Sequence, residues 1–133
     1  MRIFLDTADP TEIRRAAEAG LIDGVTTNPS LLAKVAKDRE PSDIFREICE
    51  TVEGPVSAEV VALDAEGMIQ QGKTLFEIAD NIVIKVPLTE EGLVACRALT
   101  RSSIPVNVTL CFSPTQAHPV SYTHLTLPTI CSV

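Results

Sequence analysis

One lysine interrupts a short apolar run, and this makes it the strongest candidate for chemistry in the chain. The run is Asn81–Pro87, with the sequence NIVIKVP. Its length and branched residues predict a strand that is buried on both faces. A lysine in apolar surroundings loses hydration of its ammonium form, so more of it is present as the free amine that attacks carbonyl groups. Lys85 is therefore a candidate Schiff-base former, and the alternative is a strand-end lysine that extends its ammonium into water.

Each of the other four predicted strands also carries a polar residue at or just past its carboxyl end. These residues are Asp6, Thr26 with the following Asn28, Glu59 and Thr109. Taken singly, Asp6 or Asn28 would fit a helix cap. Thr26 and Thr109 would fit ordinary strand residues, and Glu59 a solvated strand end. Together, at the strand ends that form the mouth of a βα barrel, they favour a catalytic site.

The segments that would position these residues alternate between strand and helix patterns. Asp9 is the expected N-cap of the first helix, Glu12 closes a capping box with it, and Gly20 ends that helix. Ser42 and Thr89 are the expected caps of two later helices. The predicted strands cover residues 2–6, 23–27, 56–60, 81–87 and 105–110.

Alternation of this kind predicts right-handed βα units on a parallel sheet, and so an α/β fold. A doubly wound nucleotide-binding sheet would require a Gly-rich phosphate loop after its first strand. The first loop here, Asp6–Asp9, is acidic and has no glycine. A partial (βα)8 TIM barrel with five parallel strands fits better. A complete barrel needs about 250 residues, and the chain has 133, so we expect a truncated barrel.

The composition argues against several classes of partner. The net charge is -7, and nucleic acids and anionic membranes would repel such a chain. No stretch approaches about 18 consecutive apolar residues, and the N-terminus reaches Asp6 too soon for a signal peptide. We therefore expect a soluble, cytoplasmic protein with no nucleic-acid and no membrane partner. The four cysteines are scattered without metal-ligand spacing, so we expect reduced thiols and no metal.

Five stretches carry the polar strand-end residues in a specific order and spacing. They are FLDTA from Phe4, GVTTNPS from Gly24, SAEV from Ser57, IKVP from Ile84 with Thr89 and EGL from Glu91, and NVTL from Asn107. In these stretches the sequence resembles the transaldolase family, in particular its short branch that also holds fructose-6-phosphate aldolases. The resemblance extends from Met1 to the region of Ala117.

The resemblance implies a class I aldolase mechanism on a βα barrel. Lys85 would form the Schiff base with a ketose, and Asp6 would move the proton as the carbon–carbon bond breaks. Glu59 and Thr109 would hold the water used to form and hydrolyse the imine. No metal or organic cofactor would be needed, because the iminium is itself the electron sink.

The resemblance also implies a substrate class. Asn28, with Thr26 beside it, would bind the three-carbon dihydroxyacetone unit of a sugar phosphate. Aldolase members of the family have glutamine at the position of Glu59, whereas transfer-competent members have glutamate. This favours a transaldolase of the pentose phosphate pathway, with fructose-6-phosphate aldolase as the alternative. The donor would be a ketose phosphate such as fructose 6-phosphate or sedoheptulose 7-phosphate, and we expect the full-length parent to be a homo-oligomer.

The last part of the chain departs from the family pattern. Residues 118–133 contain both histidines, the only tyrosine and no Asp, Glu, Lys or Arg. They resemble translated adaptor sequence, the alternative being a native strand or linker. We therefore expect residues 1–117 to be the N-terminal part of a transaldolase-type βα barrel and residues 118–133 to be a non-native tail. The strands with the family's phosphate-binding residues would then be missing, and the chain by itself would be an inactive barrel fragment.

Overall fold

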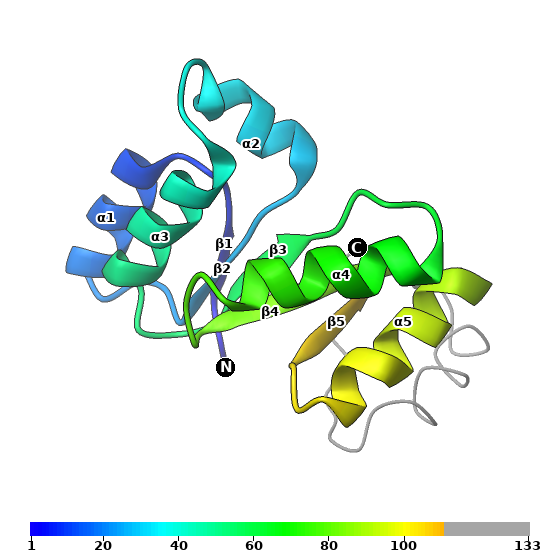
Figure 1. The fold of residues 1–133 in the computed structure, drawn as a ribbon. Coiled ribbons are helices and arrows are strands. Elements are labelled where there is room, and N and C mark those ends of the chain that lie inside the picture. The colour runs from blue at the N-terminus through cyan, green and yellow to red at the C-terminus, as the bar shows by residue number, and fades with distance from the viewer. Residues whose placement is uncertain (111–133) are drawn as a thin grey trace. The chain divides into compact units, whose positions relative to one another are not determined.

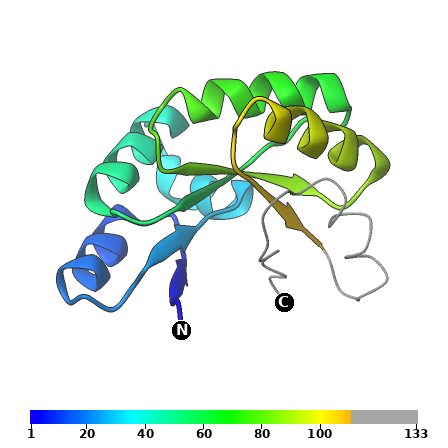
Figure 2. The ribbon, with the colours of Figure 1, turned by 90° about the horizontal axis from the view of Figure 1, so that it is seen from below.

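The structure is a computed structural model, and it describes residues 1–110 (Figure 1). In chain order the elements are β1 (Phe4–Asp6), α1 (Pro10–Glu18), β2 (Gly24–Thr26), α2 (Pro29–Ala36), α3 (Pro41–Thr51), β3 (Val56–Glu59), α4 (Ala65–Phe76), β4 (Ile82–Pro87), α5 (Glu90–Arg101) and β5 (Val106–Thr109). The strand order in the sheet is β1-β2-β3-β4-β5. Parallel strands alternate with helices along the chain, and the ribbon in Figure 2 shows this alternation. The predicted α/β fold, with the element order of a partial (βα)8 barrel, is confirmed. The expected tail, residues 118–133, lies outside the described residues.

The chain forms two compact units. The first unit comprises Met1–Glu59 with Leu75–Val83, and the second comprises Val60–Thr74 with the described residues from Ile84 onward. β4 begins in the first unit and ends in the second. Within residues 1–110, no helix has both the length and the apolar character needed to cross a membrane.

In the first unit, α1 and α3 lie side by side (Figure 1). Ile13 of α1 and Ile44 and Ile48 of α3 are fully buried, and the last two are one helical turn apart on the same face. Val25 of β2 and Val56 of β3 are also fully buried. Burial of each such side chain contributes about 1.5–3 kcal/mol. This apolar contact fixes the strands whose ends carry the candidate residues.

The start of α1 follows a local signal, with one difference from expectation. The Oδ1 of Asp9 accepts the N–H of Thr11 over 2.9 Å, so Asp9 is the N-cap as predicted. Glu12 does not close a capping box on the backbone of Asp9. Instead the Thr7 hydroxyl donates to Glu12 Oε2 over 2.8 Å and accepts the N–H of Asp9 over 3.2 Å. The predicted box is therefore wrong, because the hydroxyl of Thr7 lies between its two expected partners.

The other helix ends show one confirmed and one wrong prediction. Gly20 follows the end of α1 with a φ of +66°, a left-handed conformation that favours glycine, and its N–H donates to the Ala17 carbonyl over 2.9 Å. Ser42 is not the cap of α3, because that helix begins at Pro41 with Glu40 as its N-cap. The fixed φ of proline suits the first helical position, and this places the start one residue before the serine.

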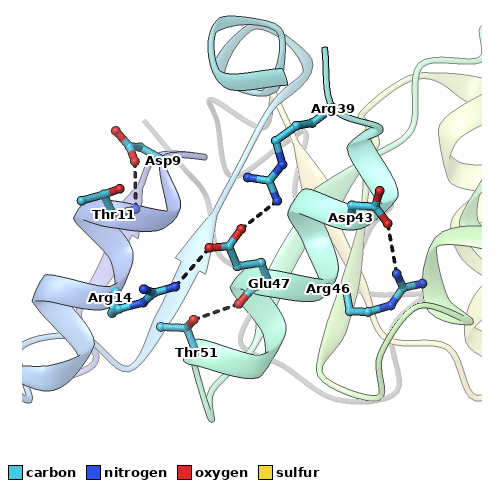
Figure 3. A network of polar contacts seen from close by, with 8 residues as sticks. All are labelled: Asp9, Thr11, Arg14, Arg39, Asp43, Arg46, Glu47 and Thr51. Atoms are coloured by element: carbon cyan, nitrogen blue, oxygen red, sulfur yellow. Dashed lines mark hydrogen bonds and ion pairs between the residues drawn. The ribbon is translucent and has the colours of Figure 1, made fainter. Parts of the chain in front are cut away.

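Glu47 links its own helix, α3, to α1 and to the segment before α3 (Figure 3). Its Oε1 accepts from Arg14 over 3.1 Å, and its Oε2 accepts from Arg39 over 2.8 Å. The arginine side chains are 56% and 48% exposed. Water therefore screens both ion pairs, and each contributes only about 0–1 kcal/mol to stability.

Asn81 directly precedes β4, and its side chain forms hydrogen bonds to the end of α3 and the residues that follow it. Its Nδ2 donates to the carbonyls of Val52 over 2.8 Å and Gly54 over 3.0 Å, with a longer contact of 3.4 Å to the carbonyl of Cys49. The backbone carbonyl of Asn81 accepts the N–H of Val56 over 2.9 Å. Because three carbonyls approach one NH2 group, the position requires a hydrogen-bond donor.

In the second unit, β4 and β5 pair in parallel, and Gly72 of α4 faces Leu99 of α5. The register aligns Ile84 with Val106. A Cβ on Gly72 of α4 would lie 3.0 Å from Leu99 Cδ1 of α5, so the glycine allows the two helices to approach. The Oγ1 of Thr89 accepts a helical N–H over 3.0 Å, which confirms Thr89 as the cap of α5.

Side chains of α4 and α5 hold the loop that precedes α4. The Oε1 of Gln71 accepts the N–H groups of Val61 and Ala62 over 2.9 and 3.0 Å. The Oε2 of Glu91 accepts the N–H of Ala65 over 2.7 Å. These side-chain oxygens are the acceptors for three backbone N–H groups that have no acceptor within a strand or a helix.

Candidate active site

The candidate residues of the first unit lie at the carboxyl ends of its strands. Asp6 ends β1, Thr26 ends β2, and the two are register partners. The hydroxyl of Thr26 donates to Asp6 Oδ1 over 2.8 Å. Asp6 is exposed and Thr26 is half-buried. One carboxylate oxygen is thus oriented by the neighbouring strand while the carboxylate remains accessible to a ligand.

Glu59 ends β3 on the same face of the sheet as Thr26. Thr26 is the register partner of Ser57, and Glu59 follows Ser57 by two positions, so the strand alternation places all three side chains on one face. Glu59 is half-buried. The next residue after Thr26, Thr27, serves the packing instead: it is fully buried and its hydroxyl donates to the Ser57 carbonyl over 2.8 Å.

Asn28 begins α2. Its Oδ1 accepts the N–H of Leu31 over 2.9 Å, so it is the N-cap of that helix. The helix-cap interpretation of this residue is therefore confirmed. Because the oxygen of the amide is used by the helix, any role in ligand binding falls to its Nδ2 group, which is a donor.

Lys85 lies inside β4 in the second unit. The residue is 7% exposed, and its neighbours Ile84 and Val86 are both fully buried. Its carbonyl accepts the N–H of Val60 over 3.1 Å. The strand position of Lys85 is therefore buried, as the apolar run predicts, and its role as a Schiff-base former stays a prediction.

Thr109 and Asn107 of β5 are the register partners of β4 residues. Thr109 is half-buried at the end of β5, opposite Pro87, and its carbonyl accepts the N–H of Leu88 over 2.9 Å. Asn107 is opposite Lys85 and only 8% exposed. Sequence reasoning missed Asn107 as a site residue. The available signal was its position two residues before Thr109, on the same face of the predicted strand.

The thiol of Cys49 and a cavity in the first unit lie away from the candidate residues. Burial, and secondarily the carboxylate of Glu50, raises the pKa of Cys49 to about 11, so this thiol stays protonated and is a poor nucleophile at neutral pH.

A cavity in the first unit is lined by the end of α1 and by residues before β2 and β3, among them Asp23 and Glu53. It lies at the amino ends of these strands, opposite Asp6 and Thr26. Among residues 1–110 no group of His, Cys, Asp and Glu side chains is arranged to hold a metal ion.

Curated relatives with high sequence identity carry one name. A "Probable transaldolase" of Hyphomonas neptunium is 57% identical over 117 residues, which cover 88% of this chain and 53% of the relative. The "Probable transaldolase" of Novosphingobium aromaticivorans is 58% identical with 88% and 53% coverage, and that of Geobacter sulfurreducens is 58% identical with 88% and 54% coverage. The chain therefore spans about half the length of the curated relatives that it matches.

A family-level comparison covers more of the chain than these alignments. Residues 3–122 match the family described as transaldolase/fructose-6-phosphate aldolase. That match includes every candidate residue, from Asp6 on β1 to Thr109 on β5. The chain belongs to the transaldolase/fructose-6-phosphate aldolase family.

Proposed function

We propose that the protein is a transaldolase, which transfers a dihydroxyacetone unit from a ketose phosphate to an aldose phosphate through a Schiff base on Lys85. The burial of Lys85, which is 7% exposed between two fully buried residues, carries this proposal. An amine at a buried strand position can attack the carbonyl carbon of a ligand bound there, with little access for bulk water. The family and the relatives' printed names support the same reaction class.

The reaction divides into bond-forming and bond-breaking steps. The amine of Lys85 adds to the C2 carbonyl of fructose 6-phosphate or sedoheptulose 7-phosphate, and loss of water gives an iminium. Asp6 then removes the proton of the C4 hydroxyl, the C3–C4 bond breaks, and the electron pair moves into the iminium to give an enamine. The aldose phosphate leaves. The enamine attacks the aldehyde of the acceptor, Asp6 returns its proton to the new C4 oxygen, and water hydrolyses the iminium to release the new ketose phosphate and the free amine.

The other candidate residues have supporting roles in this proposal. The hydroxyl of Thr26 orients the carboxylate of Asp6, to which it donates over 2.8 Å. Glu59 and Thr109 hold the water that is released and later used at the imine. Asn28 donates from its amide nitrogen to a hydroxyl of the dihydroxyacetone unit. The reaction requires no metal or organic cofactor, because the iminium accepts the electron pair.

Transfer is favoured over simple aldol cleavage by Glu59. Glutamate at this position matches the transfer-competent members of the family, and the relatives carry the name transaldolase. A transaldolase with these substrates would act in the pentose phosphate pathway and in the cytoplasm, as a homo-oligomer. Fructose-6-phosphate aldolase activity is the alternative outcome of the test.

The test uses a completed chain, in which residues 1–117 are continued with the C-terminal part of the Geobacter sulfurreducens relative. Incubation with fructose 6-phosphate and sodium borohydride reduces the iminium to a stable secondary amine. Peptide mass mapping should then find the adduct on Lys85. An adduct on the exposed Lys73 of α4, or none, would contradict the assignment.

Product analysis distinguishes the two reaction classes. The completed chain should move dihydroxyacetone to erythrose 4-phosphate much faster than it condenses free dihydroxyacetone with glyceraldehyde 3-phosphate. The reverse preference would identify a fructose-6-phosphate aldolase and would show that Glu59 does not sort the two activities.

Residues 1–133 by themselves are expected to lack turnover. A Schiff-base lysine and its proton-transfer partner must be held within about 0.5 Å of the productive geometry by surrounding residues. Residues 1–117 supply about half of the relatives' length, and residues 118–133 are proposed to be a non-native tail. Turnover by the 133-residue polypeptide equal to that of the completed chain would show that this part suffices.

A further inference from the structure

The residue after Asp6 has hydrogen bonds in three directions. Thr7 is 8% exposed. Its backbone N–H donates to the Thr26 carbonyl over 3.1 Å, and its hydroxyl donates to Glu12 Oε2 over 2.8 Å. The same hydroxyl accepts the N–H of Asp9 over 3.2 Å. Thr7 is therefore bonded to β2, to the first turn of α1 and to the loop between β1 and α1.

These bonds form a short chain that ends at the Asp6 carboxylate. The carbonyl of Thr26 accepts the backbone N–H of Thr7, and the hydroxyl of Thr26 donates to the carboxylate of Asp6. A rotation of the peptide that joins Asp6 to Thr7 would disturb both contacts. Asp6 is exposed, so surrounding side chains restrain it little, and its orientation depends on this local frame. Glu12 holds the Thr7 hydroxyl and thereby stabilises the frame from the side of α1.

We propose that Thr7, supported by Glu12, is a positioning residue for the Asp6 carboxylate in proton transfer, an inference that rests on the proposed transaldolase function. Thr7 does not touch the substrate in this role. It keeps the backbone of Asp6 in the register in which Thr26 can orient the carboxylate. A misplacement of about 1 Å can reduce a reaction rate by about 100-fold, so a single buried hydroxyl is sufficient to matter.

The test compares matched variants in the completed chain. Thr7→Val removes the hydroxyl and keeps the shape, whereas Thr7→Ser keeps the hydroxyl. Thr11→Val makes the same chemical change at an exposed position in the first turn of α1, four residues after Thr7. Thr7→Val should lower kcat for transfer by about 10- to 100-fold and leave KM within about two-fold. Thr7→Ser should recover most of the loss, and Thr11→Val should behave as the parent.

Borohydride trapping separates positioning from a general loss of structure. Lys85 should still be trapped by fructose 6-phosphate in Thr7→Val, because imine formation does not depend on Asp6 in the proposed mechanism. In an Asp6→Asn background, Thr7→Val should cause no further loss of kcat, because the group that it positions has already been removed. An additional 10-fold loss in that background would overturn the proposal. So would an unchanged kcat in Thr7→Val.

Two further outcomes remain decisive. If Thr7→Val does not fold, Glu12→Ala replaces it, and a kcat for Glu12→Ala equal to that of the parent would overturn the proposal. If the unsubstituted completed chain shows neither trapping nor transfer, the proposed function itself fails, and the role of Thr7 fails with it. Trapping and transfer by the parent, with normal kcat in Thr7→Val, would refute the positioning role alone.

Discussion

The two units hold their candidate residues in different ways. In the first unit, Asp6 is exposed and its carboxylate accepts a hydrogen bond from Thr26 on the next strand. In the second unit, Lys85 lies inside β4 and is 7% exposed between fully buried neighbours. The first arrangement controls orientation by a specific contact, whereas the second keeps the side chain away from bulk water by burial.

The difference predicts two patterns of sensitivity. Changes near the carboxylate of Asp6 should produce graded losses, because a hydrogen bond can be weakened without removing the reactive group. Changes at Lys85 should be nearly all-or-none, because the chemistry requires one amine. Substitutions elsewhere in the first unit should change the free energy of unfolding more than the activity. The size of that change should depend on how deeply the lost polar contact is buried.

The largest expected effect tests the chemistry of the second unit. In the completed chain, Lys85→Arg should lower kcat at least about 1,000-fold, because a guanidinium stays protonated and cannot act as an amine nucleophile. The measurement is transfer from fructose 6-phosphate to erythrose 4-phosphate, with borohydride trapping in parallel. Lys73→Arg, at an exposed position of α4, is the matched control and should keep full activity. Retained turnover in Lys85→Arg would break the comparison between the units.

The next effect concerns the stability of the first unit. Asn81→Asp should lower the free energy of unfolding by about 3 kcal/mol, because it replaces a donor by a charge that faces three backbone carbonyls. Urea unfolding of the completed chain measures this loss. Asp80→Asn changes the charge by one unit at the exposed neighbouring position and should alter stability by less than about 0.5 kcal/mol. Equal effects at positions 80 and 81 would show that the clustered carbonyls are unimportant.

A smaller effect is expected at the exposed ion pairs of the first unit. Glu47→Gln should cost at most about 1 kcal/mol, because the side chains of Arg14 and Arg39 are 56% and 48% exposed. The loss should shrink as salt is added, since exposed charges are screened. Urea unfolding at low and high salt provides the measurement. A cost above about 2 kcal/mol would show that this network is more than a screened surface contact.

The smallest effect at neutral pH is expected at Cys49. Its folded-state pKa of about 11 lies above the ordinary value of 9.0, so the folded chain keeps the proton that the unfolded chain loses. This contribution to stability is complete below about pH 9 and is lost as the pH rises toward about 11. Cys49→Ala should flatten the fall in unfolding free energy over that range.

The cause of the raised pKa has its own control. Glu50→Gln should leave most of the shift in place, because burial of the thiol is the larger cause and the neighbouring carboxylate the smaller one. Alkylation followed by peptide mapping across pH 7–11 reports the thiolate directly. Modification of Cys49 at the rate of an ordinary exposed thiol near pH 8.5 would contradict the assignment.

Features coded by neighbouring residues were predictable from the sequence. The five strands, the cap at Thr89 and the end of α1 at Gly20 follow from local patterns of apolar residues, hydroxyls and glycine. The burial of Lys85 follows equally from the apolar residues on either side of it. In each case the signal and its effect lie within one turn or one strand.

Features that depend on register or on competition between side chains were not predictable. The contact between Asp6 and Thr26 requires the alignment of two strands, and the placement of Asn107 opposite Lys85 requires the alignment of β4 with β5. Glu12 was expected to bond the backbone of its own helix. It accepts instead from Thr7, a residue outside the helix whose hydroxyl also takes the N–H of Asp9.

The support of the loop before α4 has a consequence for protein engineering. Designers change the specificity of βα proteins by exchanging such loops. Here a graft that displaces the N–H groups at Val61 and Ala62 would leave Gln71 without partners, at a cost of about 1 kcal/mol for each lost bond. Leu63, which is 90% exposed, lies between these anchors and the N–H of Ala65. A library with its insertion point at position 63 would vary the loop and keep both supports.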